Sequence, residues 1–479
     1  MRKLSEQTNS QTNPSIQVWV RNEFSGLDLG DSRLNDRFLK IVSDFSLQPT
    51  GSIPKASGSW AATKGAYRFF DNDKANPLSM LEPHFRSTIQ RAESQKVVLA
   101  LQDSTKLNFS HHPETQGLGP IANNSDKTVA FWLHPTLVVT PEGTALGLAN
   151  AEYWVRDPKE FRVKCRKRNK QDFKEKESYR WFKGYQQTQD MAEQCPRSLV
   201  VCVCDREGDI YDVLAQAVRP EDQQPRAHCL IRARVNRAVD CDEAGKLWEL
   251  LDKQEIAGTH RIWVRGRDGV PKREVKLSIK YTQVRLPAPA LKKQLLAIKI
   301  WVIEAREIDP PNAETALCWR LLSSLPITDV ASAVEKVEWY GQRWQIEVYF
   351  KTVKSGCKLL ERQLEHRQRL ERVMAVDLIV AWRILFMTKA SRETPDLPAE
   401  TILEENESQA LRAYLNERDN LKIKKLGLRQ AVRAIAQLGG FLGRKGDGDP
   451  GPITIWRGLL RLHDITKCWE LFNQSSRKK

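Results

Sequence analysis

The sequence predicts an α/β protein with a mixed-sheet core, a β-rich insertion in that core, and helical regions at both ends. Two short apolar runs, at 97–102 and 199–204, each end abruptly in an aspartate, which is typical of buried strands. Residues 275–281 alternate between apolar and polar side chains, as a half-buried strand does. Apolar residues before residue 92 and after Lys354 recur at helical spacing instead.

Composition narrows the class of partner. The chain has 479 residues, and its 76 Lys and Arg exceed its 60 Asp and Glu, giving a net charge of +16. Such a balance favours a polyanionic partner, either nucleic acid or an anionic membrane surface. The apolar runs are too short for a membrane span, and the first residues lack a secretory signal, so we expect nucleic acid. The nine cysteines form no CxxC pair, which fits a reducing cytoplasm.

Changes in periodicity divide the chain into five parts. We expect a helical region over 1–92, the first part of an α/β core over 93–237, and a β-rich insertion over 238–325. The core resumes over 326–390 with two helices, and a helical region follows over 391–479, where an apolar face on the last helix suggests either dimerisation or packing within the chain.

The first of these parts opens with a helix signal and carries repeated basic residues. Asp31 or Ser32 is a suitable N-cap for the segment that follows. The pattern fits a small helical bundle, and it also fits a DNA-binding module. On the second interpretation the DNA contacts are Arg33, Arg37, Lys64 and Arg68.

Three acidic residues are candidates for one catalytic site. Asp103 and Asp205 follow the two apolar runs, and strand-end acids in α/β proteins point into the crevice at the carboxyl edge of the sheet. Glu347 lies later, on a predicted helix. Converging carboxylates repel one another unless cations neutralise them, and hard oxygen ligands suit Mg²⁺ or Mn²⁺. Each aspartate alone could equally be an ordinary strand-end cap.

The segment YGQRWQIEVYFKTVK, at 340–354, places charge inside an apolar surface. On one continuous helix, Tyr340, Arg343, Glu347, Lys351 and Lys354 fall within roughly 80° of arc, between apolar residues on both sides. Because a solvated face should lie opposite the apolar stripe, we expect this stripe to contact DNA phosphates. The alternative, a surface pair of Glu347 with Lys351, leaves the flanking apolar residues unexplained.

This same segment resembles the YREK signature of the insertion-sequence-four family of DDE transposases. The residues QDST at 102–105 and CDREGDI at 204–210 are similar to the family's two aspartate motifs. The order of landmarks along nearly the whole chain resembles the transposon-five type. These landmarks include GDSR at 30–33, KGAYRF at 64–69, KES at 176–178 with Trp181, and RWQIE at 343–347.

The resemblance implies a ribonuclease-H-like core in which Asp103, Asp205 and Glu347 bind two Mg²⁺ ions, with Mn²⁺ able to substitute. It implies cut-and-paste transposition by a synaptic homodimer on transposon-end and target DNA. The enzyme would nick the end, form and reopen a hairpin, and join the 3′-ends to target DNA. Trp319 would stack on a flipped base, with Trp344 as a neighbour. Arg232 would line the DNA channel.

Two rival functions stay open from sequence alone. A related ribonuclease-H-like nuclease would cut without joining ends, and a silent transposase-derived protein would only bind DNA. Glu207 and Asp209 could support Asp205 or could cap the following helix. We interpret His134, on a predicted strand, as a core or edge residue rather than a catalyst.

Overall fold

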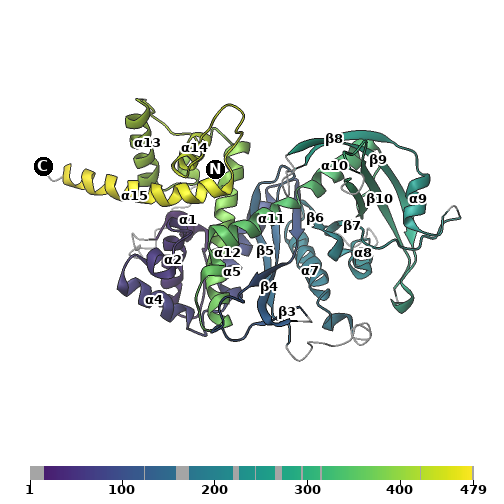
Figure 1. The fold of residues 1–479 in the computed structure, drawn as a ribbon, viewed down its shortest axis with the longest axis horizontal. Helices are drawn as coiled ribbons and strands as arrows, with labels where there is room; N and C mark the ends of the chain where they lie inside the picture. The colour runs from purple at the N-terminus through teal and green to yellow at the C-terminus, as the bar shows by residue number, and fades with distance from the viewer. Residues whose placement is uncertain are drawn as a thin grey trace. The chain divides into compact units, whose positions relative to one another are not determined.

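The computed structural model describes residues 16–122, 125–157, 172–218, 226–242, 244–264, 272–292, 295–312, 316–420 and 422–476. The chain forms two compact units (Figure 1). Phe85–Lys351 makes up the sheet unit, and Met1–His84 together with Thr352–Lys479 makes up the helical unit. The chain passes from the helical unit into the sheet unit within helix α5 (Pro77–Glu93).

A mixed sheet forms the centre of the sheet unit. Strand β1 (Val97–Gln102) pairs antiparallel with β4 (Ser125–Val139) on one side and parallel with β6 (Leu199–Cys204) on the other. β6 pairs parallel with β7 (His228–Arg232), and β4 pairs antiparallel with β5 (Ala145–Trp154). This is a ribonuclease-H-like arrangement, which confirms the predicted fold class.

The β-rich segment extends this sheet. β7 pairs antiparallel with β11 (Cys318–Ser323), and β10 (Ile298–Glu307), β9 (Arg273–Leu286) and β8 (Gly258–Val264) follow in that order. A single hydrogen-bonded ladder therefore connects the core strands to the insertion.

Burial explains the apolar runs of the core strands. Five consecutive residues of β1 and five of β6 are buried, as expected of central strands covered on both faces. On one face, Trp181, Tyr185 and Met191 of α7 pack into a cluster with residues of these strands. The remaining elements of this unit are β2 (Thr105–Asn108), β3 (Gly119–Ala122), α7 (Tyr179–Gln194), α8 (Tyr211–Ala217), α9 (Leu247–Lys253), α10 (Val330–Gly341) and α11 (Trp344–Lys351).

The helical unit begins with short N-terminal helices around an aromatic core. The Asp31 carboxylate accepts a hydrogen bond from the Arg33 backbone N–H at 2.9 Å, so Asp31 is the N-cap of α2. Phe38 of α2 packs against Phe69 of α4, with ring centroids 6.1 Å apart. These helices are α1 (Val18–Glu23), α2 (Ser32–Leu47), α3 (Ile53–Ser57) and α4 (Trp60–Phe70).

The C-terminal part of the helical unit surrounds a long buried helix, α12 (Arg367–Glu393). Asp377 of α12 forms a buried ion pair with Arg362 at 2.8 Å, and Arg372 donates to the backbone carbonyl of Phe70. None of the helices in the described ranges combines the length and the apolarity needed to cross a membrane. The other helices are α13 (Glu405–Asp419), α14 (Leu428–Leu438) and α15 (Pro452–Ser476).

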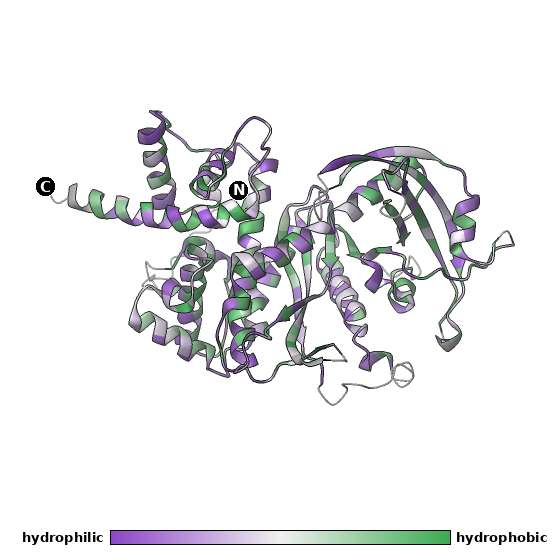
Figure 2. Cartoon of the chain, viewed as in Figure 1, coloured by the Kyte–Doolittle hydropathy of each residue, from purple (hydrophilic) through white to green (hydrophobic). Residues whose placement is uncertain are grey.

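Helix α15 is both packed and exposed. Trp456 and Leu459 are buried within their own chain, whereas Leu471 and Phe472 near its end are largely exposed. Hydrophilic and hydrophobic residues alternate along its length in Figure 2. The helix therefore contributes to its own core and also presents apolar side chains on the surface.

Candidate active site

Asp103 follows β1 directly at the carboxyl edge of the sheet. Its side chain is only 18% exposed, and the backbone N–H of Ser104 donates to its Oδ1 at 2.7 Å. The buried apolar strand fixes the position from which this carboxylate emerges.

Asp205 occupies the matching position after β6. Because β1 and β6 are parallel and Gln102 pairs with Cys204, the two aspartates emerge at the same edge. Asp205 caps the 3₁₀ turn that follows (Arg206–Gly208), accepting the Glu207 backbone N–H on Oδ1 at 2.8 Å. The cap interpretation and the cluster interpretation of this residue are therefore compatible.

Glu347 is connected to the first aspartate through a shared arginine. Arg343 lies 3.0 Å from Asp103 (Nη1 to Oδ2) and 2.5 Å from Glu347 (Nη2 to Oε1). Two acids more than two hundred positions apart along the chain thus belong to one electrostatic cluster.

The helix that carries Glu347 is interrupted, and the prediction of a continuous helix over 340–354 is wrong in this respect. Helix α10 ends at Gly341, α11 begins at Trp344, and a π-helical turn follows over Thr352–Gly356. The break frees Arg343 to reach both acids. The arc calculation, which assumed uniform helical rotation, therefore does not describe one surface.

The electrostatics of Asp103 report on the cluster. Burial, and next the negative charge of Asp205, raise the pKa of Asp103 to about 7, with Glu347 adding to the effect. The Arg343 guanidinium opposes this rise. Burial and the neighbouring acids therefore disfavour the ionised form of Asp103, as is typical of carboxylates grouped around a cation site.

The donor set fits hard divalent ions. Within the described ranges, no three His, Cys, Asp or Glu side chains lie close enough together to form a ready metal cage. Arg343 instead supplies the positive charge between Asp103 and Glu347. Carboxylate oxygens with positions left for water are the ligands that Mg²⁺ prefers, so the three acids suit such an ion by their chemistry, although as placed in the described part of the chain they do not form a group that would hold it.

Three of the predicted DNA-binding residues form a cluster among themselves. Tyr340 is buried, and its ring meets that of Trp319 edge to face at a centroid distance of 5.1 Å. The Tyr340 side chain hydrogen-bonds to Arg232, which also donates to the Cys318 carbonyl at 2.9 Å. Trp344 is half-buried at the start of α11, and Lys351 is exposed at its end.

Lys354 belongs to the helical unit. It lies half-buried in the π-helical turn, three residues beyond the last residue of the sheet unit. Its expected phosphate contact stays a prediction.

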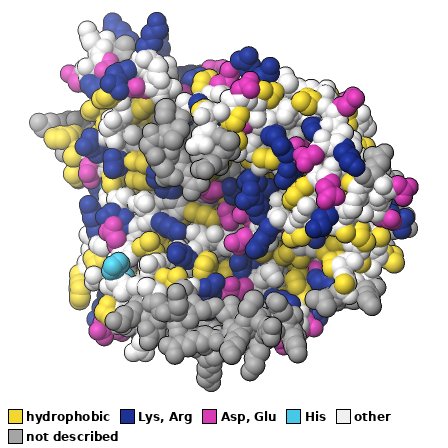
Figure 3. All heavy atoms as spheres, turned by 45° about the vertical axis from the view of Figure 1, so that its right-hand side comes forward, with side chains coloured by type: hydrophobic (Ala, Val, Ile, Leu, Met, Phe, Trp, Pro, Cys, Tyr) yellow, Lys and Arg dark blue, Asp and Glu magenta, His cyan; other side chains and the backbone are white. Residues whose placement is uncertain are grey.

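A basic pocket lies next to Asp205. It has a volume of about 450 Å³ and includes Arg206, the residue after Asp205, together with Trp248, whose ring lies 4.3 Å from the Arg320 guanidinium. The charge of Arg206 contributes to a lowered pKa of Arg232, after the larger effect of burial. Further lining residues are Glu207, Arg232, Ala233, Arg234 and Cys318. Lys and Arg side chains gather around acidic ones on the face shown in Figure 3.

The N-terminal candidates lie on two helices. Lys64 and Arg68 are exposed one turn apart on α4, and Arg33 is exposed at the start of α2, where it pairs with Asp31. Arg37 is half-buried and packs against α4, because a Cβ added at Gly65 would lie 2.7 Å from its Nη1.

Sequence reasoning missed two aromatic residues on α4. Trp60 is 79% exposed and Tyr67 is also exposed. Their spacing from Lys64, four before and three after, places all three near one helix face, and this signal was present in the sequence.

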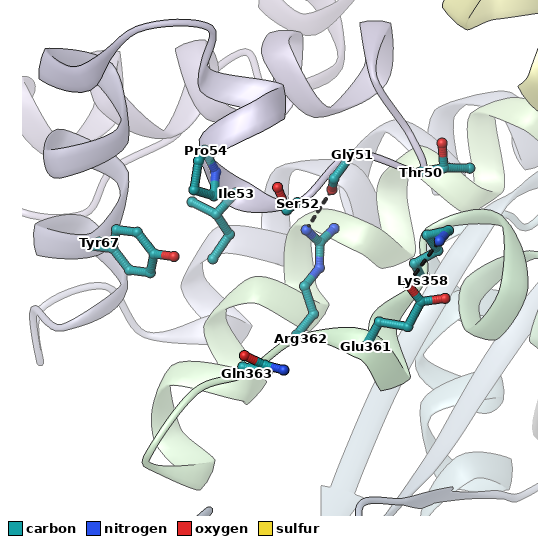
Figure 4. A pocket seen from close by; sticks show the side chains of 10 residues that line it. All are labelled: Thr50, Gly51, Ser52, Ile53, Pro54, Tyr67, Lys358, Glu361, Arg362 and Gln363. Carbon is teal, nitrogen blue, oxygen red and sulfur yellow. Dashed lines mark hydrogen bonds and ion pairs between the residues drawn. The ribbon is translucent and has the colours of Figure 1, made fainter. Parts of the chain in front are cut away.

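A hollow of about 400 Å³ in the helical unit is lined by residues of 50–54 and 358–363, with Tyr67 (Figure 4). Arg362 donates to the Gly51 carbonyl at 2.9 Å, and Lys358 pairs with Glu361 at 2.8 Å. The charged groups in its wall thus have partners within the protein.

The lesser acids have structural partners. Asp209 accepts the backbone N–H groups of Arg234 and Val235 at 2.8 and 3.0 Å and pairs with Arg237, so it fixes the exit of β7. Glu207 lies 3.5 Å from Arg180. His134 is wholly buried, in agreement with its interpretation as a core residue.

Comparison with known families assigns a class to these features. Residues 16–75 match the family described as transposase DNA-binding, residues 155–382 match transposase DDE domain, and residues 379–470 match transposase Tn5 dimerisation domain. Together with the fold and the acidic cluster, these matches define a DNA transposase. The chain belongs to the insertion-sequence-four family of DDE transposases, of the Tn5 type.

The matches also identify partners. DNA and a second copy of the chain are the partners of this enzyme, and DDE domains use divalent metal ions. The DDE match includes Asp205 and Glu347, whereas Asp103 precedes it. The place of Asp103 in the site therefore rests on its geometry.

Proposed function

We propose that Asp103, Asp205 and Glu347 are the catalytic carboxylates of this transposase and hold two Mg²⁺ ions. The observation that carries the proposal is the pair of bonds from Arg343 to Asp103 and Glu347, combined with the charge effect of Asp205 on Asp103. A guanidinium held between two clustered acids shows that this place attracts positive charge, which supports a cation site there.

When bound, the ions would activate water or a 3′-hydroxyl and stabilise the leaving oxygen of a phosphodiester. The protein supplies the geometry around them. The two parallel strands fix Asp103 and Asp205 at one sheet edge, while the break before α11 lets Arg343 and Glu347 reach the same place. Arg343 holds Asp103 and Glu347 close to each other.

Basic and aromatic residues beside the acids would position DNA. Arg232, Arg343 and Lys351 would neutralise phosphates next to the scissile one, Lys354 would extend this contact, and Tyr340 would donate a hydrogen bond to another phosphate. The basic pocket beside Asp205 supports this path. At the N-terminus, Lys64 and Arg68 would bind the terminal inverted repeats, assisted by Arg33 and Arg37.

The proposed reaction is cut-and-paste transposition through a hairpin. After hydrolytic nicking, the freed 3′-hydroxyl attacks the opposite strand, water reopens the hairpin, and the 3′-ends attack target DNA. Trp319 would stack on a base extruded by the sharp bend, with Trp344 nearby. Its edge-to-face packing on Tyr340 supports a role as a rigid platform. We expect transposition to take place in the cytoplasm, at the nucleoid.

The test uses DNA carrying the native element's ends, with Mg²⁺ and the purified protein. Each acid is replaced by its amide, in Asp103→Asn, Asp205→Asn and Glu347→Gln. Each variant should bind the ends normally but nick them more than about a hundredfold more slowly, a larger loss than is usual for residues that only orient metal ligands. Glu193→Gln, an exposed change on α7, is the matched control. Wild-type nicking in any of the three variants would remove that acid from the site.

A second measurement tests the hairpin step. Trp319→Ala should reduce hairpin formation by more than it reduces nicking, because base stacking contributes about 1–3 kcal/mol per base. Equal reduction of both steps would contradict the stacking role. Absence of strand transfer from a pre-cleaved 3′-end by the wild-type protein would favour cutting without joining.

A further inference from the structure

Behind the carboxylates, a second arginine contacts both aspartate-bearing loops. Arg180 lies on α7, and its side chain is only 11% exposed. Its Nε–H donates to the Ser104 Oγ at 3.0 Å, and its Nη2 lies 3.5 Å from Glu207 Oε2. The guanidinium stacks on the Trp154 ring at 4.5 Å, which restricts its orientation.

Two of the residues that Arg180 contacts are those whose backbone N–H groups bond the acids; its Nη1 also donates to the Glu177 carbonyl at 2.5 Å. The Ser104 backbone N–H donates to Asp103 Oδ1 at 2.7 Å, and the Glu207 backbone N–H donates to Asp205 Oδ1 at 2.8 Å. Arg180 therefore connects, through one planar group, the two residues whose amides fix the carboxylates.

A directed hydrogen-bond chain anchors the Ser104 end. Arg180 can only donate, so the Ser104 hydroxyl accepts its bond and directs its own proton to His134 Nδ1, 2.9 Å away. His134 Nε2 then carries the ring proton and donates to Gln102 Oε1 at 3.3 Å. The opposite tautomer would leave Nε2 and this carbonyl oxygen as two facing acceptors. Residues 102 and 104, on both sides of Asp103, are thus held by one neutral ring.

Close packing also supports this arrangement. A Cβ on Gly184, one turn after Arg180 on α7, would lie 2.4 Å from Gln102 Oε1. The helix can approach β1 closely enough for Arg180 to reach Ser104 because this position has no side chain.

We propose that Arg180 is a positioning residue that sets the spacing of Asp103 and Asp205 for the divalent ions. This inference rests on the proposed carboxylate site. An arginine is required because a lysine ammonium is a point charge, which cannot bond Ser104 and Glu207 with two fixed donors while lying flat on Trp154. Arg343 bonds two acids directly, whereas Arg180 acts through the loops.

The test measures Mn²⁺ binding to the full-length protein, without DNA, by electron paramagnetic resonance of the free ion. The binding lost in Asp205→Asn defines the component due to the site. Arg180→Lys should raise the Mn²⁺ dissociation constant of this component by about tenfold or more, the range for residues that orient metal ligands. Arg197→Lys, the same change at an exposed arginine beyond α7, should leave it unchanged.

Hydrogen exchange in β1 and β6 shows whether Arg180→Lys folds. If it does not, the positioning role is tested instead by variants of the two residues that Arg180 contacts near the acids. Ser104→Ala removes one contact of Arg180, Glu207→Gln removes the negative charge of another, and each should weaken Mn²⁺ binding. Adding Ser104→Ala to Arg180→Lys should have little further effect, since both changes break one link. Wild-type Mn²⁺ affinity in a folded Arg180→Lys protein, or in both Ser104→Ala and Glu207→Gln, would overturn the proposal.

A last comparison separates this inference from the carboxylate assignment. Loss of Mn²⁺ binding in Asp205→Asn with normal binding in the Arg180 and Ser104 variants would refute only the positioning role. Unchanged binding in Asp205→Asn would refute the carboxylate site itself.

Discussion

If Asp103 binds metal as proposed, its raised pKa should make that binding depend on pH near neutrality. A proton and a divalent ion would then compete for the same carboxylate, and the pKa of about 7 means that the proton is half-bound at pH 7. The ionised fraction falls from about nine-tenths at pH 8 to about one-tenth at pH 6. The Mg²⁺ concentration for half-maximal nicking should therefore rise by about tenfold between these two pH values.

Two substitutions should move the pKa of Asp103 in opposite directions. Arg343→Gln removes the cation that lowers the pKa of Asp103, so the Mg²⁺ requirement at pH 7 should resemble that of the wild type at lower pH. Asp205→Asn removes a charge that raises the pKa, so the midpoint of Asp103 should fall. Because Asp205→Asn also removes a proposed ligand, the pKa of Asp103 in this variant is followed directly, by nuclear magnetic resonance of its carboxyl carbon without metal.

The assay is a Mg²⁺ titration of nicking at pH 6, 7 and 8, with end binding followed separately by fluorescence anisotropy. DNA phosphates do not titrate in this range, so binding to DNA should change little. A Mg²⁺ requirement that is constant from pH 8 to pH 6 would refute the reasoning.

Three further predictions concern binding and stability. Lys64→Gln should weaken end binding uniformly across sequences and reduce the salt slope by about 1, measured by titration at several salt concentrations. Gly184→Ala should destabilise the sheet unit by about 1–3 kcal/mol by forcing its Cβ against Gln102, measured by hydrogen exchange in β1. Asp377→Ala should destabilise the helical unit by about 3–5 kcal/mol, because it leaves the Arg362 charge buried without its carboxylate; hydrogen exchange in α12 checks this, and unchanged protection would contradict it.

The linkage of Asp103 has a second, metal-free consequence for stability. Folding raises the pKa of this acid from 3.8 to about 7, so the folded state binds the proton more tightly than the unfolded state. The contribution of Asp103 to stability is therefore complete below pH 3.8 and is lost as the pH rises through 7.

The sequence was sufficient for the features that depend on local pattern. The runs before Asp103 and Asp205 are continuous and apolar because central strands are covered on both faces, so both strands and both acids were predictable. Glu347 lies near Asp103 as expected, although the continuous helix on which that expectation partly rested is wrong. The break between α10 and α11 was not predictable, because no proline marks it and the contacts of Arg343 with distant acids accompany it.

The contacts of Arg180 could not be predicted from the sequence. Its neighbours Ser104, Trp154 and Glu207 come from three other segments, and nothing in its local sequence distinguishes it from a solvated helix residue. Trp60 is the reverse case, since its exposure on α4 could have been inferred from helical spacing alone.

The unbroken ladder from β6 through β7 to β11 has a mechanical consequence. Asp205 follows β6 and Trp319 lies on β11, only two strand pairings away. A flap on a hinge could follow a moving substrate, but strands joined edge to edge keep a nearly fixed span. In the proposed reaction, the DNA would therefore provide most of the deformation, because the protein holds Asp205 and Trp319 at a nearly constant separation.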